Sequence, residues 1–262
     1  MPLMNKLAPT PEQRREEWVR LAVPGGFLYF LENYVKIEDQ ARGTIPFELW
    51  PCHQRAAEAL AKEKLIVVLK ARQTGLSSVI ALEALYYALH RPYDRTLFVS
   101  RNEKLAALLI SYCQIAVAGL RDTSQLVSES QSKLVFANGS EIVSLPANPA
   151  TGRGYPASRV YLDEAAFLMY AELIMQGIAP TLSNGGQMTV LSTPKGQHNL
   201  FARLWMGVEG GDWSRHRVHW SDCPRYTPEW AERTRAEMTR QAFAEEFDLD
   251  FAASGDAVFD LD

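Results

Sequence analysis

The stretch that decides the fold of this chain is LIVVLKARQTGLSS, residues 65–78. Its first part, Leu65 to Leu69, is a short apolar run rich in β-branched residues, which is typical of a strand buried on both faces. Residues 70–78 then bring a glycine, two cations and several hydroxyl side chains, and an apolar segment of helical length runs from Val79 to His90. A strand, a loop and a helix in this order indicate an α/β layer architecture.

Strands and helices alternate along the rest of the chain. Because ligands of mostly parallel sheets lie at the carboxyl ends of the strands, the residues that follow each strand are the first candidates for a site. We expect strands at 96–100, 159–164, 188–192 and 217–220, a hairpin over 133–144 that turns at Asn138-Gly139, and helices after Thr10, over 51–62, over 104–118 and near 227–248.

Composition restricts the class of protein. The chain has 262 residues, 47% of them hydrophobic and 22% charged, which excludes disordered, collagen-like and coiled-coil proteins. Three widely spaced cysteines predict neither a disulfide framework nor a cysteine metal cluster. We expect no membrane span and no export, because the apolar runs are short and the N-terminus lacks the core of a signal peptide. The net charge of −4 argues against a generally basic nucleic-acid binder, but it leaves room for a local basic groove.

Residues 70–78 have the features of a phosphate-binding loop. Such a loop needs converging backbone N–H groups and a helix N-terminus directed at the anion. Gly75 permits the tight turn, Lys70 and Arg72 supply cations, and a serine at the start of the helix can offer a hydroxyl to Mg²⁺. Leu76 stands where the usual pattern has lysine, so a plain strand-to-helix turn is the alternative interpretation.

The strand at 159–164 ends in two acids, Asp163 and Glu164. Burying carboxylates at the end of a strand costs desolvation free energy, so their presence there indicates a function. The first can hold the magnesium shell, and the second can orient or deprotonate a water molecule. A solvated pair that caps the next helix is the structural alternative, and the phosphate-loop features upstream weaken it.

Four segments together resemble one known family. KARQTGLSS at 70–78 resembles the deviant phosphate loop of the large terminase subunits of tailed bacteriophages, in which a basic residue early in the loop replaces the usual lysine. VYLDEAAF at 160–167 resembles the family's magnesium-binding strand and catalytic glutamate, and STPKG at 192–196 resembles its coupling motif. PFELWPCHQ at 46–54 is similar to the segment that contacts adenine. The shared order of the four motifs, over roughly 45–200, makes the resemblance specific.

The resemblance implies a role for each candidate site residue. Glu164 polarises the attacking water, Ser77 and Asp163 hold Mg²⁺, and Thr193 senses the γ-phosphate of ATP. Arg153, between two glycines, is expected to be an arginine finger that reaches a neighbouring subunit's nucleotide, with an exposed loop arginine as the structural alternative. The residues expected to bind ATP and its phosphates are Gln54, Lys70, Arg72, Gln73, Thr74, Gly75, Leu76, Ser77 and Ser78.

The resemblance also implies a fold and a biological setting. The fold is an α/β P-loop NTPase of the ASCE or RecA-like branch, with a mostly parallel sheet flanked by helices and with the strand at 96–100 between the two ATP motifs. We expect a helical appendage at 1–45, an ATPase core at 46–240, and at 241–262 a linker towards a C-terminal nuclease domain that this chain lacks. The implied cofactors are ATP and Mg²⁺.

The implied activity is that of a packaging motor that hydrolyses ATP and drives double-stranded viral DNA into the procapsid. Its partners are that DNA, the portal protein and the small terminase subunit, in the cytoplasm of a bacterial host and transiently at the portal vertex. The chain is expected to be a monomer in isolation and a homo-oligomeric ring on the portal, without nuclease activity and without a membrane.

Two other functions remain open at this point. A superfamily-2 helicase or remodelling ATPase shares the Asp-Glu pair, but it needs a second RecA-like domain, for which 262 residues leave no room. A nucleotide-binding scaffold that hydrolyses nothing would explain the missing lysine, but it has no use for Glu164 as a base. An ATPase assay with a magnesium chelation control separates these alternatives.

Overall fold

The computed structural model of the chain describes residues 21, 25–39, 42–120, 125–183 and 185–252. The helix expected after Thr10 lies outside these residues. None of the described helices is long and apolar enough to cross a lipid bilayer.

An eight-stranded sheet forms the centre of the molecule, in the order β10-β3-β9-β8-β4-β7-β6-β5. Six neighbouring strands, from β10 to β7, run parallel, and the β7-β6-β5 edge is antiparallel. The expected mostly parallel sheet is therefore confirmed. The strands are β3 (Leu65–Lys70), β4 (Arg95–Ser100), β5 (Leu126–Glu129), β6 (Lys133–Phe136), β7 (Glu141–Pro146), β8 (Arg159–Asp163), β9 (Gln187–Ser192) and β10 (Ser214–Val218).

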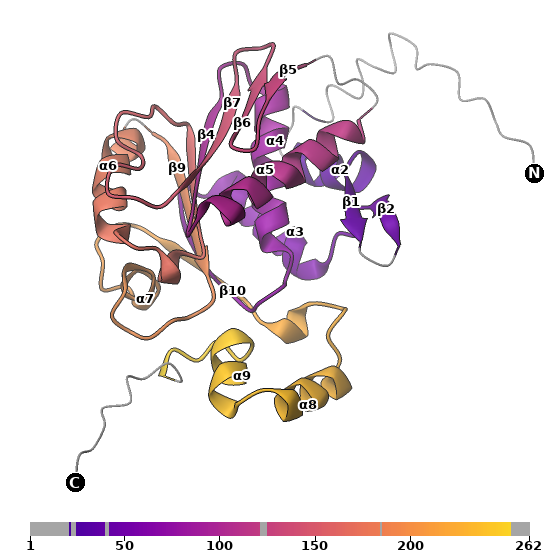
Figure 1. Ribbon diagram of the computed structural model, residues 1–262, viewed down its shortest axis with the longest axis vertical. Coiled ribbons are helices and arrows are strands. Elements are labelled where there is room, and N and C mark those ends of the chain that lie inside the picture. Colours follow the sequence, from indigo (N-terminus) through magenta and orange to yellow (C-terminus); the bar gives the residue numbers. More distant parts are fainter. Residues whose placement is uncertain (1–20, 22–24, 40–41, 121–124, 184, 253–262) are drawn as a thin grey trace, which may run out of the picture.

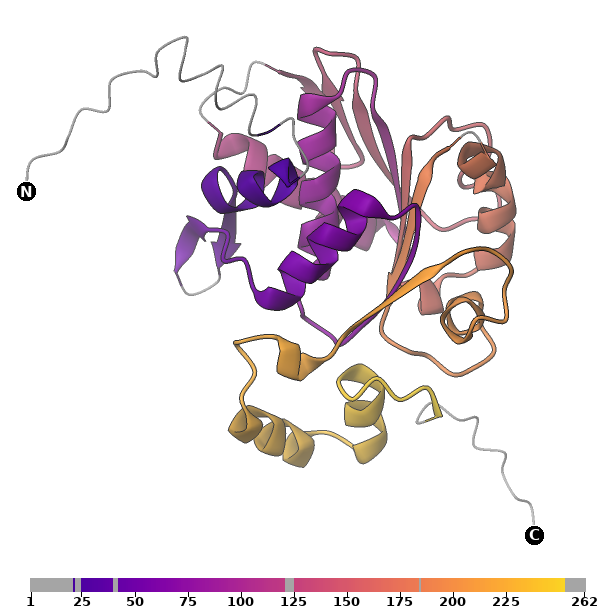
Figure 2. The ribbon, with the colours of Figure 1, turned by 180° about the vertical axis from the view of Figure 1, so that it is seen from behind.

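Helices cover both faces of the sheet (Figures 1 and 2). One face carries α3 (Pro51–Lys62), α4 (Leu76–His90) and α5 (Glu103–Ala118), and the other carries α6 (Ala171–Ser183) and α7 (Leu200–Met206). Successive side chains of β3 alternate between the two cores: Ile66 and Val68 pack with the α3–α5 layer, and Val67 and Leu69 with the α6–α7 layer. This alternation explains why the strand reads as a continuous apolar run.

The described part of the N-terminal region contains α2 (Gly26–Asn33) and a small hairpin of β1 (Lys36–Asp39) and β2 (Gly43–Pro46). The hairpin was not among the expected elements. The rings of Phe27 and Phe30 lie 5.5 and 5.7 Å from the ring of Tyr86 on α4. The region is thus packed into the same hydrophobic core as α4.

The C-terminal segment contains the helices expected near 227–248. It forms two helices, α8 (Pro228–Glu237) and α9 (Arg240–Glu246), which lie beyond one end of the sheet (Figure 1). The break has a local cause, because Met238 is extended and the Thr239 hydroxyl accepts a hydrogen bond from the Ala242 amide, which starts a new helix. Short 3₁₀ turns, η1 (Ala165–Phe167) and η2 (Trp220–Asp222), follow β8 and β10.

Candidate nucleotide-binding site

The strand order brings the expected motifs to one edge of the sheet. β9 lies between β3 and β8, with Ser192 opposite Leu69 and with Leu191 opposite Asp163. All three strands are parallel, so their carboxyl ends meet at this edge. The expected phosphate loop after β3, the expected coupling motif after β9 and the two acids at the end of β8 therefore lie side by side.

The phosphate loop is a tight turn that leads directly into α4. Gln73 and Gly75 have left-handed backbone angles, with φ of 55° and 78°. The Thr74 hydroxyl donates to the Ala71 carbonyl over 3.2 Å, and the Thr74 carbonyl lies 2.7 Å from His53 Nε2. A Cβ at position 75 would lie 2.9 Å from the same imidazole nitrogen, so both backbone angle and space require glycine there.

The first residue of the loop reaches the expected catalytic acid. Lys70 Nζ lies 2.6 Å from Glu164 Oε1, and the lysine side chain is only 5% exposed. Burial opposes the charge of this ammonium group, but Glu164 and Asp163 more than offset the cost and raise the pKa of Lys70. A buried, charged lysine that faces two carboxylates forms the cationic centre of the site.

Asp163 is the most buried acid of this group. It accepts hydrogen bonds from the Ser77 hydroxyl at 3.2 Å and from the Glu164 amide at 3.1 Å. Burial raises its pKa to about 6, against the opposing effect of Lys70. A desolvated carboxylate beside a serine hydroxyl offers the hard oxygen donors that Mg²⁺ prefers, so these two residues fit the cation.

Glu164 has a left-handed backbone, with φ of 53° and ψ of 46°. Non-glycine residues in this region are uncommon and cluster at functional sites. Ser192 at the end of β9 fixes the turn, because its hydroxyl accepts from the Ala166 amide at 3.1 Å and lies 3.5 Å from Glu164 Oε2. The next residue, Thr193, is buried, with 3% of its surface exposed.

Arg72 occupies a different environment from Lys70. Its guanidinium is exposed and lies 3.4 Å from the carboxylate of Glu246 on α9, and its amide donates to the Glu246 carbonyl over 2.8 Å. The Tyr226 hydroxyl donates to the Gln73 carbonyl over 3.1 Å. The C-terminal segment thus holds the outer side of the phosphate loop.

The remaining expected residues are placed less uniformly. Ser77 and Ser78 lie in the first turn of α4, but Leu76, its first residue, is buried in the core instead of lining the loop. Gln54 is exposed on α3 and donates to Glu58 on the same helix over 3.1 Å. Arg153 is exposed on the loop that packs along α6, and among the described residues no hydrogen bond or ion pair joins it to the Lys70–Glu164 pair.

Sequence reasoning missed four residues that contact the loop. His53 stacks on Trp50 at 4.8 Å beneath the Thr74 carbonyl, and Tyr112 on α5 hydrogen-bonds to Ser78. Tyr226 and Glu246 approach from the C-terminal segment. Only His53 had a usable signal, since it stands within PFELWPCHQ beside Gln54. The other three depend on contacts between distant parts of the chain.

Fold and cluster together define a P-loop nucleoside-triphosphatase fold. The chain belongs to the family described as "Terminase large subunit, T4likevirus-type, N-terminal", whose model matches residues 67–262. Among curated proteins it is 26% identical, over 245 residues, to the terminase large subunit of Thermus virus P23-45, and it matches that of Thermus phage G20c to the same extent. Each match covers 80% of this chain and 50% of the relative. The chain thus spans about half the length of these relatives.

Solved structures support the fold. A variant of the large terminase ATPase domain of Thermus phage P74-26 superimposes with a TM-score of 0.65 at 20% identity, covering 78% of this chain and 95% of that one. The large terminase of bacteriophage HK97 superimposes with a TM-score of 0.65 at 14% identity, and the match covers 86% of this chain and 54% of that one. The large terminase of a thermophilic bacteriophage, solved in complex with ATP-γ-S, superimposes with a TM-score of 0.63 at 9% identity, and the match covers 78% of this chain and 53% of that one.

Proposed function

We propose that this chain is the ATP-hydrolysing motor domain of a viral DNA-packaging terminase. The observation that carries the proposal is the convergence of Lys70, Ser77, Asp163 and Glu164 at the carboxyl ends of β3 and β8. Membership in the terminase family and the nucleotide-bound structure of a protein with the same fold support it.

The chemistry we assign to each residue follows from its environment. Backbone N–H groups of residues 73–78 and Lys70 would bind the phosphates, with Arg72 at the outer side. Ser77 and Asp163 would hold Mg²⁺, which neutralises phosphate charge when bound. Glu164 would orient and deprotonate the attacking water, because its carboxylate projects from the strand end beside the loop. Thr193 would report the γ-phosphate to the segment after β9, and Gln54 would contact adenine.

The test is steady-state ATP hydrolysis by the purified chain. We expect turnover that needs magnesium and stops on addition of a chelator. Binding of ATP without any turnover would favour a nucleotide-binding scaffold and would contradict the assignment of Glu164. Stimulation by single-stranded instead of double-stranded nucleic acid would favour a helicase-like remodeller.

The partners are part of the proposal. Terminase membership supports double-stranded viral DNA, the portal protein and the small terminase subunit as partners, at the procapsid portal in the host cytoplasm. We propose a ring of subunits on the portal and a monomer in isolation, with Arg153 reaching the nucleotide of the adjacent subunit. Its exposed position on the α6 side suits such a role.

DNA cleavage is not part of this assignment. Within the residues that the structure describes, no three His, Cys, Asp or Glu side chains converge in a way that could hold a metal ion. Incubation with supercoiled DNA and Mn²⁺ tests this point, and the expected result is intact DNA.

A further inference from the structure

A groove of about 1030 Å³ opens at the edge of the sheet opposite the phosphate loop. It is lined by the first residues of β4, β8 and β9, by the two residues just before β3, by the C-terminal ends of α3 and α4, and by the loop that precedes β8. These are the amino ends of the parallel strands, whereas the Lys70–Glu164 pair lies at their carboxyl ends. The groove is therefore separate from the proposed nucleotide site.

Four exposed cations surround this groove: Lys62, Lys64, Arg91 and Arg95. We call them the groove cations. Two acids are nearby, but both are already paired: Glu63 lies 2.7 Å from His216, and Asp94 forms an ion pair with Arg159. None of the groove cations has an acidic partner within the described part of the chain. A protein with a net charge of −4 thus concentrates unpaired positive charge on one surface.

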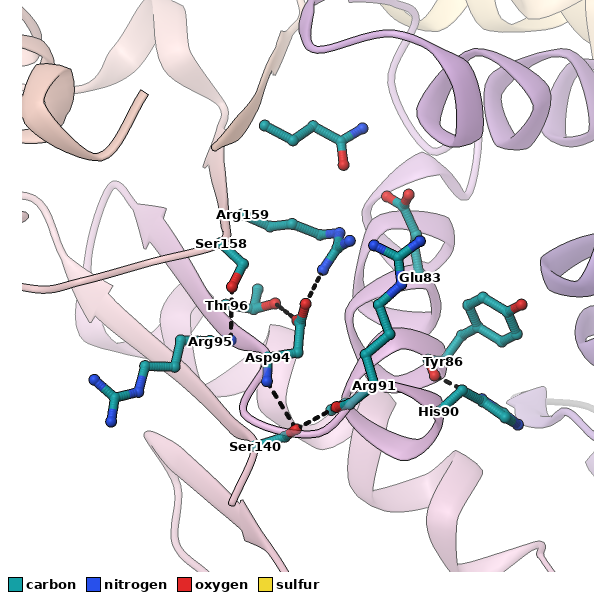
Figure 3. A network of polar contacts seen from close by, with 12 residues as sticks. Glu83, Tyr86, His90, Arg91, Asp94, Arg95, Thr96, Ser140, Ser158 and Arg159 are labelled. Carbon is teal, nitrogen blue, oxygen red and sulfur yellow. Dashed lines mark hydrogen bonds and ion pairs between the residues drawn. The ribbon is translucent and has the colours of Figure 1, made fainter. Parts of the chain in front are cut away.

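The floor of the groove holds a buried ion pair within a network of polar contacts (Figure 3). Arg159 is 5% exposed, pairs with Asp94 and stacks over the ring of Tyr87 at 3.4 Å. Its buried Nε has no hydrogen-bond partner. The Asp94 amide is held by the Ser140 hydroxyl at 3.0 Å, and Figure 3 shows the Arg95 side chain directed away from the Asp94–Arg159 pair. Arg95 is therefore free to contact a ligand.

Tyr93 is an unusual residue at the rim. Its side chain is 75% exposed, and its backbone has a left-handed φ of 59°. A Cβ at Gly139 would lie 2.6 Å from its ring, so the hairpin turn supports the aromatic ring at close range. An exposed aromatic side chain on a strained backbone, beside unpaired cations, is the kind of feature that binding surfaces retain.

Helix dipoles account for only part of the charge. Lys62 is in the last turn of α3 and Arg91 follows α4, where the helix C-termini stabilise cations. Each helix end carries only about half an elementary charge, and Lys64 and Arg95 are not at helix ends. The remaining positive charge is open to an external anion.

We propose that this groove binds the phosphate backbone of double-stranded DNA. The proposal rests on the proposed packaging function and adds the surface that holds the DNA. Duplex DNA carries one negative charge per about 1.7 Å of axis, so a single ligand can meet all four groove cations at once. Since these cations come from the starts and ends of different elements, a continuous polyanion fits them better than an isolated acidic side chain.

The experiment measures binding of a fluorescent 20-base-pair duplex to the 262-residue chain without nucleotide, over a series of salt concentrations. The double variant Lys64→Glu/Arg95→Glu should bind at least about tenfold more weakly at low salt. A plot of the logarithm of the binding constant against the logarithm of the salt concentration should become less steep, its slope decreasing in magnitude by about 2, because two phosphate contacts are lost. Thermal unfolding of each variant checks that the fold is intact.

A matched control is Lys36→Glu/Lys104→Glu, two exposed lysines on β1 and α5 with the same change of charge. It should stay within about twofold of the unmodified chain. Equal weakening in both double variants would overturn the groove assignment, as would displacement of the duplex by polyglutamate at equal charge concentration, which indicates an acidic protein partner. Absence of ATP hydrolysis in the unmodified chain contradicts the proposed function but not this binding result, so the two failures are distinguishable.

Discussion

Lys70 and Glu164 form an ion pair of 2.6 Å although 94 positions separate them in the sequence. Their strands are not neighbours, since β9 lies between them. The expected phosphate cation and the expected general base thus neutralise each other in this structure. We expect the phosphates of a bound nucleotide to compete for Lys70 and to release Glu164 for water, which would link nucleotide binding to activation of the base.

Glu164→Gln should retain ATP binding and lose turnover by about 10²–10⁴-fold, because a carboxamide preserves size but cannot accept the proton. Fluorescent nucleotide binding and phosphate release measure the two effects separately. Near-normal hydrolysis by this variant would show that Glu164 is not the base.

Lys70→Ala should reduce turnover more than Arg72→Ala does. Lys70 is buried against Glu164, whereas Arg72 is exposed and paired with Glu246. Only removal of the lysine therefore leaves the carboxylates of Asp163 and Glu164 without a cation. Phosphate release at saturating ATP is the measurement. Leu76→Ala is unsuitable as a control, because Leu76 lies in the core and its truncation costs about 2–5 kcal/mol. A larger effect of Arg72→Ala would assign the phosphate contact to the arginine.

Arg153→Ala should lower ATP hydrolysis only at protein concentrations at which subunits associate. For the unmodified chain we expect specific ATPase activity to rise with protein concentration, since an arginine supplied by a neighbour is worth about 10³–10⁵ in turnover in related systems. The variant should lose this rise and keep its nucleotide affinity. Activity that does not depend on concentration, or equal loss at every concentration, would place the arginine in its own subunit or make it structural.

Glu83→Gln should change how stability depends on pH. Glu83 is fully buried on α4, accepts from the Tyr161 hydroxyl at 2.6 Å and faces Arg159, Asp94 and Arg91. Burial raises its pKa to about 7 from an ordinary 4.5. The folded chain therefore keeps a proton that the unfolded chain has lost, and this residue makes stability fall as pH rises from about 4.5 to above 7.

Glutamine has no such titration. The variant should match the unmodified chain near pH 4.5 and exceed its unfolding free energy by about 1–3 kcal/mol at pH 8.5. Urea unfolding at the two pH values measures the difference. A gap that stays constant between them would show that the carboxyl is not protonated in the folded chain.

Much of the fold could be predicted from the sequence, because the signals are local. The runs at 65–69, 96–100 and 188–192 became β3, β4 and β9, and Asn138-Gly139 turned the expected hairpin. Boundaries were less accurate: α4 begins at Leu76 instead of Val79, and β10 begins at Ser214 instead of Arg217. Hydrophobic periodicity identifies an element, whereas capping contacts and strand pairing determine where it ends.

The candidate site divides in the same way. Motif by motif, the sequence indicated the loop at 70–78, the acids Asp163 and Glu164, and Thr193. It left open whether Lys70 or Arg72 faces the phosphates, and it gave no sign of Tyr112, Tyr226 or Glu246. Those contacts come from α5 and the C-terminal segment, whose positions against the loop no local pattern encodes.

By itself, the sequence determined which residues form strands, turns and carboxylate-bearing strand ends, because these depend on the backbone preferences of each residue and its near neighbours. Only the tertiary structure decided that β9 separates β3 from β8, that Lys70 and not Arg72 reaches Glu164, and that four cations from separate elements surround one groove. The physical reason is that strand order and helix packing are set by burial of apolar surface across the whole chain, and charges distant in sequence become neighbours only as a consequence of that burial.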